Sequence, residues 1–164
     1  MLESLGISIS PLASANCGWE TDWPKELLDE AEGLPLKNML VSCGDAQRQG
    51  ELVITRYGLE GGPIYRLGPA IRQQAAPHIT LDLKPTFTTE QLVKKMESAK
   101  RDFLKEAKQR WKISPAALAI LKHLHGPFED AESLAQCVKH CRIPLTRPRP
   151  IEEAISSAGG VQWP

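Results

Sequence analysis

The chain has 164 residues with 20 basic and 20 acidic side chains, and 41% of its residues are hydrophobic. These values are typical of one globular domain or two small ones and argue against a largely disordered chain. The zero net charge argues against a general binder of nucleic acid or membrane surfaces, and no apolar run approaches the ~20 residues that cross a bilayer. Four cysteines are too few for a disulfide scaffold, so we expect a cytoplasmic protein.

The first half of the chain is predicted to consist of short strands with two helices. Strands are expected at residues 7–10, 36–43, 51–57 and 78–83, and helices at 25–32 and 63–74. Pro11 is expected to end the first strand because proline interrupts a strand. The polar segment 44–50 is bracketed by glycines, so it is expected to form a loose hairpin loop.

The second half is predicted to be helical. One long helix is expected over 88–112, because its apolar residues recur every three or four positions on one face: Leu92, Met96, Ala99, Phe103 and Ala107. A second helix is expected to begin at Ser114-Pro115, and a third to run over 131–141 with Cys141 on its apolar stripe.

The ends of the sequence give two further expectations. Leu2 and Leu5 resemble the last turn of a helix whose beginning is missing, and residues 151–161 look like the start of another element. Both ends therefore look cut. Between the helices and this tail, the segment 142–150 is extended and proline-spaced, and its arginines (Arg142, Arg147 and Arg149) suit a carboxylate or phosphate partner.

One group of residues has the composition of a metal site: Cys137 and Cys141, with His123, His125 and His140 nearby. Zinc requires soft or imidazole donors that converge from suitable spacings. Both cysteines fall on the apolar stripe of the predicted helix, and free cysteine is often buried in cores. Core packing is therefore favoured and no metal ligand is predicted; a zinc-dependent fold is the third alternative for the chain.

No catalytic residue is predicted. Cys17 and Cys43 are candidate nucleophiles, but neither lies in a nucleophile motif, and no histidine is tied to either cysteine by the sequence. A different possibility is an interaction module that binds nucleic acid or an acidic partner through the basic side chains of 88–112. Acidic residues at i,i+4 spacing favour a solvated helix face instead, so a nucleic-acid partner is not expected.

Residues 56–63, with glycines at 58, 61 and 62, lie between a strand and a helix and are predicted to form a tight turn. Together with the preceding strand they resemble the signature "strand, T-x-aromatic-G-L-x-G, helix" of bacterial NAD(P)/FAD-dependent, or aminoacetone-oxidase-family, FAD-binding oxidoreductases. Three other segments are similar to the same family: 15–18, 34–38 and 151–161, which ends in Ala-Gly-Gly-Val. The resemblance runs almost from end to end and matches the insert, or cap, region of that family.

This resemblance implies an α+β fold without a complete Rossmann unit. It consists of a small antiparallel β-barrel subdomain (7–86 plus 142–150) and an inserted helical subdomain (87–141), and 151–164 is a truncated return to a missing FAD-binding domain. That domain of the same polypeptide is the implied partner, and no membrane partner is expected.

The implied role is to cover FAD and shape the substrate pocket of an oxidoreductase. The chain alone is expected to be inactive and to hold no cofactor. In the parent protein the residues near the flavin would be Tyr57, Gly58, Gly61, Gly62, Ala158, Gly159 and Gly160.

Overall fold

The computed structural model describes residues 8–162, so the helix turn expected at Leu2 and Leu5 lies outside the described residues. The strands are β1 (Ile9–Asn16), β2 (Trp19–Glu20), β3 (Pro35–Cys43), β4 (Ala46–Thr55), β5 (Gly58–Glu60), β6 (His78–Asp82), β7 (Cys141–Pro144) and β8 (Ser156–Val161). The helices are α1 (Lys25–Ala31), α2 (Gly62–Arg72), α3 (Thr89–Lys95), α4 (Phe103–Arg110), α5 (Pro115–Ile120) and α6 (Ala131–Lys139). A π-helix, η2 (Leu121–His125), continues α5, and η3 (Ile151–Glu153) is a single 3-10 turn.

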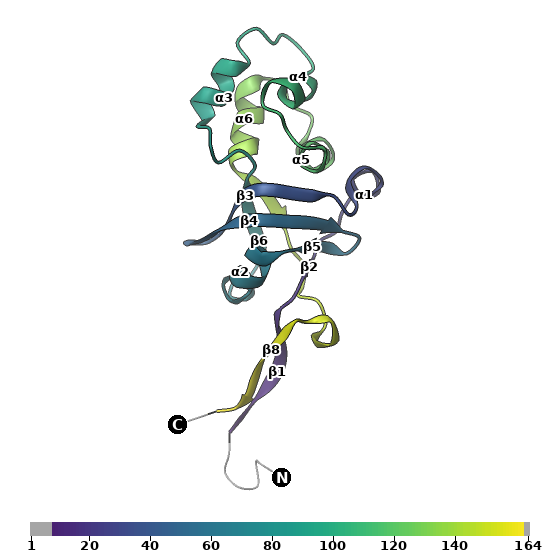
Figure 1. Cartoon of the computed structure of the whole chain (residues 1–164), viewed down its shortest axis with the longest axis vertical. Helices are drawn as coiled ribbons and strands as arrows, with labels where there is room; N and C mark the ends of the chain where they lie inside the picture. The colour runs from purple at the N-terminus through teal and green to yellow at the C-terminus, as the bar shows by residue number, and fades with distance from the viewer. Residues whose placement is uncertain (1–7, 163–164) are drawn as a thin grey trace.

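Six strands form a curled antiparallel sheet in the order β2-β5-β4-β3-β6-β7 (Figure 1). Backbone hydrogen bonds join its two edges: the Thr146 amide donates to the Glu20 carbonyl (2.9 Å), and the Glu20 amide donates to the Arg147 carbonyl (2.8 Å). The segment after β7 therefore closes the sheet into a small barrel. The fold class is α+β, as expected, and because every strand pair in 8–162 is antiparallel, the described chain holds no Rossmann unit.

The barrel interior is filled by the inward-facing residues of alternating strands. In β6 the side chains of Ile79 and Leu81 are fully buried, while their neighbours are partly exposed, which is the period-two pattern expected from the sequence. Helix α2 packs on β4 with Ile64, Leu67 and Ile71 buried. Burying such side chains, at roughly 2 kcal/mol each, is the main source of the barrel's stability.

The loop between β3 and β4 is tighter than expected. Cys43 pairs with Ala46, so only Gly44 and Asp45 form the turn, and the segment predicted as a loose loop at 44–50 mostly belongs to β4. Gly44 has φ +55°, a left-handed conformation that glycine adopts without cost and that two-residue hairpins require. The polar residues of 47–49 misled the prediction because this end of the hairpin faces solvent.

The strand at the start of the chain does not end at Pro11. β1 continues to Asn16 and pairs with β8 in a separate two-stranded sheet, which we call the stem (Figure 1). The ladder shifts register between Ser10 and Ala13, so Pro11 lies in a bulge, where its missing amide hydrogen breaks no ladder bond. The tail expected to begin another element is η3 and β8.

The long helix predicted over 88–112 is wrong. The chain forms α3 and α4, with a break over 96–102, and Asp102 adopts a left-handed conformation (φ +52°) and caps α4 through its carboxylate. The break is stabilised by Arg110, which donates to the Lys95 carbonyl at 3.1 Å and to the Ser98 hydroxyl at 2.7 Å. Folding back buries Trp111, whose indole N–H donates to the Leu92 carbonyl at 3.0 Å.

The remaining helices begin where the sequence predicts, but one ends early. Ser114 caps α5 and Asp130 caps α6, each through its side-chain oxygen. α6 ends at Lys139, and Cys141 is the first residue of β7, paired with Leu81, so its predicted place on the third helix is wrong. Over residues 8–162, no helix is both long enough and apolar enough to cross a membrane.

A substitution at Lys112 tests the end of α4. Lys112 follows the helix with φ +51°, a conformation that costs a non-glycine residue about 1 kcal/mol and that glycine normally occupies at this position. Lys112→Gly is therefore expected to raise the free energy of unfolding by about 1 kcal/mol. Urea unfolding followed by circular dichroism measures the change. Lys108→Gly, inside α4, is the control and should lower stability by about 1 kcal/mol. If both glycine substitutions change stability equally, Lys112 does not adopt the left-handed conformation.

Candidate functional site

The glycine-rich segment is not only a turn: it forms the β4–β5 turn, β5 and the start of α2. Two of its glycines are explained by close backbone packing. A Cβ on Gly58 would lie 2.0 Å from the Trp19 carbonyl oxygen, and one on Gly61 would lie 2.3 Å from the Glu51 carbonyl oxygen. Gly62 has no atom within 4 Å of its Cβ position. The proposed cofactor role of these glycines stays a prediction.

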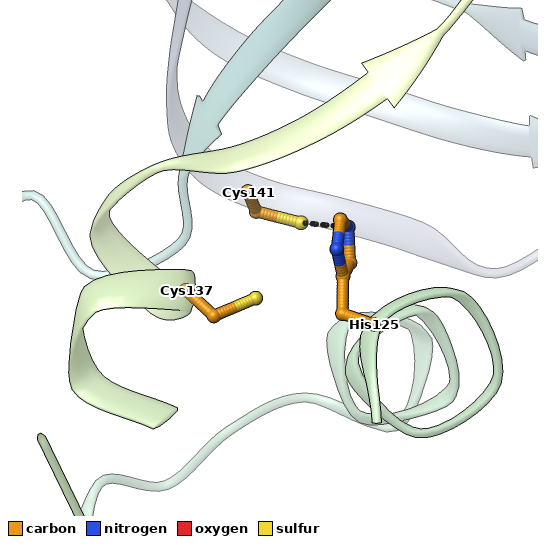
Figure 2. Close-up of side chains that lie close together, drawn as sticks. All are labelled: His125, Cys137 and Cys141. Carbon is orange, nitrogen blue, oxygen red and sulfur yellow. Dashed lines mark hydrogen bonds between the residues drawn. The ribbon is translucent and has the colours of Figure 1, made fainter. Parts of the chain in front are cut away.

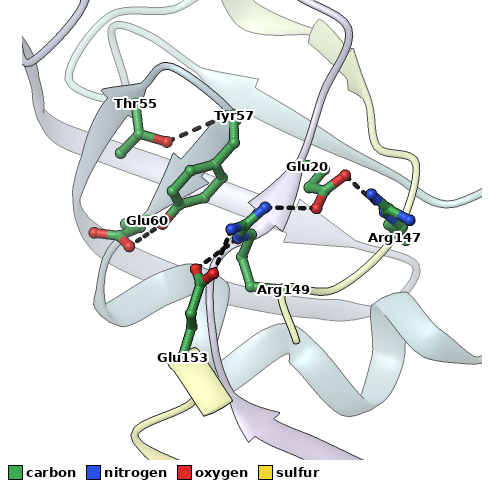
Figure 3. Close-up of polar contacts among 8 residues, drawn as sticks. Glu20, Thr55, Tyr57, Glu60, Arg147, Arg149 and Glu153 are labelled. Atoms are coloured by element: carbon green, nitrogen blue, oxygen red, sulfur yellow. Dashed lines mark hydrogen bonds and ion pairs between the residues drawn. The ribbon is translucent and has the colours of Figure 1, made fainter. Parts of the chain in front are cut away.

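Tyr57 belongs to a group of polar side chains at the base of the barrel, which we call the base cluster: Glu20, Tyr57, Glu60, Arg147, Arg149 and Glu153 (Figure 3). Arg149 is its centre. Its guanidinium donates to Glu20 at 2.7 Å and to both oxygens of Glu153 at 2.8 and 2.5 Å, and it lies 4.3 Å from the centre of the Tyr57 ring. The carboxylates expected to meet Arg147 and Arg149 are thus Glu20 and Glu153 of the same chain.

The contacts of the base cluster shift the pKa values of two of its members, Tyr57 and Glu20. The Tyr57 hydroxyl donates to the Glu60 carboxylate, and burial, reinforced by that carboxylate, raises the pKa of Tyr57 well above its usual range. The hydrogen bond from Arg147 (2.7 Å), helped by Arg149, lowers the pKa of Glu20. At neutral pH the phenol is therefore a permanent donor, and Glu20 is ionised.

The ion pairs of the base cluster join three parts of the chain. Glu20 lies on β2, Arg147 and Arg149 lie on the segment that closes the barrel, and Glu153 lies on η3, which leads into the stem. Two cations and three carboxylates balance closely, so the cluster presents no strong charge to a ligand. The cluster is therefore best described as a set of ion pairs that connects the start of the stem to the barrel.

The dependence of stability on pH tests the ion pairs of Glu20. Because the pKa of Glu20 is depressed in the folded state, its stabilisation is complete above the ordinary value of 4.5 and is lost as the pH falls through the lower folded pKa. Glu20→Gln is therefore expected to lower stability at pH 7 and to lower it less as the pH falls below 4.5, as urea unfolding at pH 7 and pH 3 would show. Glu152→Gln, which removes a carboxylate with no ion pair in 8–162, should leave stability nearly unchanged at both pH values.

The other predicted cofactor residues lie elsewhere. Ala158, Gly159 and Gly160 are on β8, in the two-stranded stem, whereas Gly58 and Gly61 pack within the six-stranded sheet. Gly159 is needed for pairing, because a Cβ there would lie 2.2 Å from the Pro11 carbonyl oxygen. The structure thus places the two glycine groups on different elements, the first at β5 and the start of α2 and the second on the stem.

The stem is unusually apolar for an exposed ribbon. Among the described residues, the large hydrophobic side chains with substantial exposure are Ile9 (40%), Leu12 (64%), Ile155 (71%) and Val161 (43%), and all lie in the stem or directly before it. A two-stranded ribbon has little core of its own and is marginally stable alone. Exposed apolar side chains that gather in one region are typical of interaction surfaces, so the stem is a candidate interface.

A groove of about 660 Å³ lies between β3 and the start of α5, on the helical side of the barrel. Lys37, Lys84 and Lys112 line it, together with Asn38, which has φ +56°. Burial, and then the charge of Lys112, lower the pKa of Lys84, whose ammonium donates to the Lys112 carbonyl at 2.9 Å. The lining would suit an anionic ligand. Sequence reasoning missed this groove, because its lysines are far apart in the chain.

The candidate nucleophiles have structural surroundings. Cys17 is buried, and Cys43 lies 2.6 Å from the Gln74 side-chain nitrogen, with burial raising the pKa of its thiol. A protonated, buried thiol is a poor nucleophile.

Only three of the five residues in the possible metal group lie together in the structure. His123 contacts Glu30, and His140 is exposed, whereas His125, Cys137 and Cys141 come together (Figure 2).

Comparison with known proteins agrees with this architecture. The sequence model of the family described as "HI0933-like protein barrel and H2TH domain" matches residues 13–156. A search of curated proteins finds no match to the chain. The matched range covers the barrel and all the helices described above, and it confirms the expected resemblance to a flavoprotein insert. The chain therefore belongs to the HI0933-like barrel and H2TH domain family, the insert region of the HI0933-like FAD-dependent oxidoreductases.

Proposed function

We propose that the chain acts as the cap of an FAD-dependent oxidoreductase: the stem connects it to a flavin-binding domain, and the barrel covers the flavin and shapes the substrate pocket. The flavin would supply the redox chemistry, and the cap would exclude water and position the substrate. The four cysteines are free thiols, in keeping with a cytoplasmic location.

The observation that carries this proposal is the pairing of the two ends of the described chain. Ile9 lies opposite Val161, and the amide of Gln162 donates to the carbonyl of Ser8 at 2.9 Å. A domain inserted into another must leave and rejoin its host at neighbouring points, as these paired strands do. Two strands that leave the barrel side by side are therefore well suited to connect it to a host domain.

The exposed side chains of the stem support the same partner. Leu12 and Ile155 are 64% and 71% exposed, although both are residues that normally lie in a core. A host domain packed against the stem would cover them. Covering such side chains contributes roughly 25 cal/mol for each Å² of apolar area removed from water.

The described residues do not themselves fit FAD. Dinucleotide folds hold the pyrophosphate at a helix N-terminus that follows a parallel strand and a glycine motif. The strand pairs of residues 8–162 are all antiparallel. Backbone atoms of neighbouring strands occupy the space beside Gly58 and Gly61, so a pyrophosphate has no room at these glycines. On this proposal the host domain binds the flavin, and the described residues alone carry out no chemical step with it.

The experiment is a graft of residues 8–162 in place of the corresponding insert of an HI0933-like oxidoreductase. We expect the graft to restore protection of the bound flavin from a soluble fluorescence quencher, relative to a host whose insert is replaced by a short glycine linker. Leu12→Ser with Ile155→Ser in the graft should return the flavin to the exposed level. The matched control is Lys108→Ser, on exposed helix α4.

Two results would contradict the proposal. One is a flavin equally exposed in the graft and in the linker host. The other is stoichiometric, high-affinity binding of FAD to the isolated chain, measured by flavin fluorescence, since this would place the whole cofactor site within the cap.

The alternative of a nucleic-acid or acidic partner gains no specific support. Its basic side chains are divided between α3 and α4, and Arg110 is engaged with Glu106, Lys95 and Ser98. Salt-sensitive retention on a polyanion column remains its test.

A further inference from the structure

We infer that His125, Cys137 and Cys141 form a binding site for a thiophilic divalent cation, with zinc as the best match. The three ligand atoms, one from each residue, all lie within 4.8 Å of one another. The Cys141 sulfur lies 3.4 Å from His125 Nε2 (Figure 2). Zn–S and Zn–N bonds of about 2.3 and 2.0 Å in a tetrahedron place neighbouring ligand atoms about 3.5 Å apart, so this pair already has the spacing of a zinc site.

The site forms because three elements of different kinds meet. Cys137 lies in the last turn of α6, Cys141 begins β7, and His125 is the last residue of the π-helix η2. The core-packing interpretation assumed that both cysteines share a helix stripe. Because the helix ends at Lys139, the two sulfurs instead converge from two elements, and the Cys-x-x-x-Cys spacing falls within the range used by zinc knuckles.

Burial distinguishes the three ligands. Cys141 is fully buried, whereas Cys137 and His125 are each partly exposed. A cation could therefore reach the site from the side of Cys137 and His125, and a water or an external ligand would fill the fourth position. Three protein ligands with one open position is the arrangement of zinc sites that bind an exchangeable ligand.

The surroundings also orient the histidine. Its Nε2 faces the Cys141 sulfur, which is the second sulfur ligand of the proposed site. The π-helix that places the ring is a rare conformation, which is found disproportionately at functional sites.

Cobalt titration of the full chain tests the site. Adding Co²⁺ to the reduced, metal-free chain is expected to give stoichiometric binding, with the visible bands of tetrahedral cobalt and a thiolate-to-cobalt charge-transfer band. Zn²⁺ should then bleach both. His125→Gln and Cys137→Ser, at two partly exposed positions, should each weaken Co²⁺ binding at least about tenfold. These two variants carry the test, because Cys141→Ser alters a buried residue.

His140→Gln is the matched control, because His140 lies between the two cysteines in sequence but is exposed and outside the cluster; it should bind Co²⁺ like the parent chain. Absence of tetrahedral bands, or bands that persist in His125→Gln and Cys137→Ser, would overturn the inference. So would oxidative linkage of Cys137 to Cys141 that saturating Zn²⁺ does not slow, since this would identify the pair as a redox couple only.

Discussion

Gly58→Ala is expected to lower the free energy of unfolding by about 4 kcal/mol. The new Cβ would lie 2.0 Å from the Trp19 carbonyl oxygen and 2.9 Å from the Glu20 Cα. Both neighbours are backbone atoms of β2, which pairs with β5 at this point, so neither can move without breaking the sheet. Urea unfolding of the isolated chain, followed by tryptophan fluorescence, measures the loss.

Gly62→Ala is the matched control, because it lies in the same motif, in the first turn of α2, with open space around its Cβ position. It should change stability by less than about 0.5 kcal/mol. If the two alanine variants lose the same stability, the packing explanation for Gly58 is wrong. A stability loss at Gly58 alone would mean that this glycine serves the fold, whatever it also does for a cofactor.

Trp111→Ala is expected to cost about 4 kcal/mol, since truncating a buried aromatic side chain removes its contacts and leaves a cavity. The indole is 2% exposed and ties α4 to α3 by its hydrogen bond to the Leu92 carbonyl, across the break that replaces the expected long helix. We also expect a lower helical signal in circular dichroism, because α3 and α4 are too short to be stable apart from this packing.

Trp111→Phe separates the two contributions. Phenylalanine keeps most of the apolar contact but cannot make the hydrogen bond. The lost hydrogen bond should lower the free energy of unfolding by about 1 kcal/mol, in addition to the loss caused by the smaller ring. Lys105→Ala, on the exposed side of α4, should leave stability within about 0.5 kcal/mol of the parent chain. A cost below about 1 kcal/mol for Trp111→Ala would contradict a helix pair folded back around this residue.

The sequence predicted those elements whose local pattern agrees with their environment. The alternation in β6 and the helix of α2 with proline in its first turn both follow from rules that act within one element. The break before α4 was missed because the apolar stripe continues through it: Met96 and Ala107 are both buried although they lie in different segments. The signal that could have located it is Asp102, a good N-cap residue directly before Phe103.

The site was harder to predict, because it depends on contacts between distant residues. Arg149 meets Glu20 across more than a hundred residues, and the extended segment that carries it closes the barrel without an alternating pattern. The convergence of His125 with Cys137 and Cys141 requires a π-helix and an early helix end, neither of which has a reliable sequence signal. What the sequence did provide, through a family resemblance, was the architecture in which these contacts form.

The opposed position of Ile9 and Val161 has a consequence for how a host polypeptide would fold. Paired strand residues lie about 5 Å apart, so a folded cap would connect the two parts of a host domain across a gap no wider than a tight turn. An unfolded insert of the same length would instead impose the entropic cost of closing a very long loop, which grows with the logarithm of the loop length. Early folding of the cap would therefore speed assembly of the domain around it.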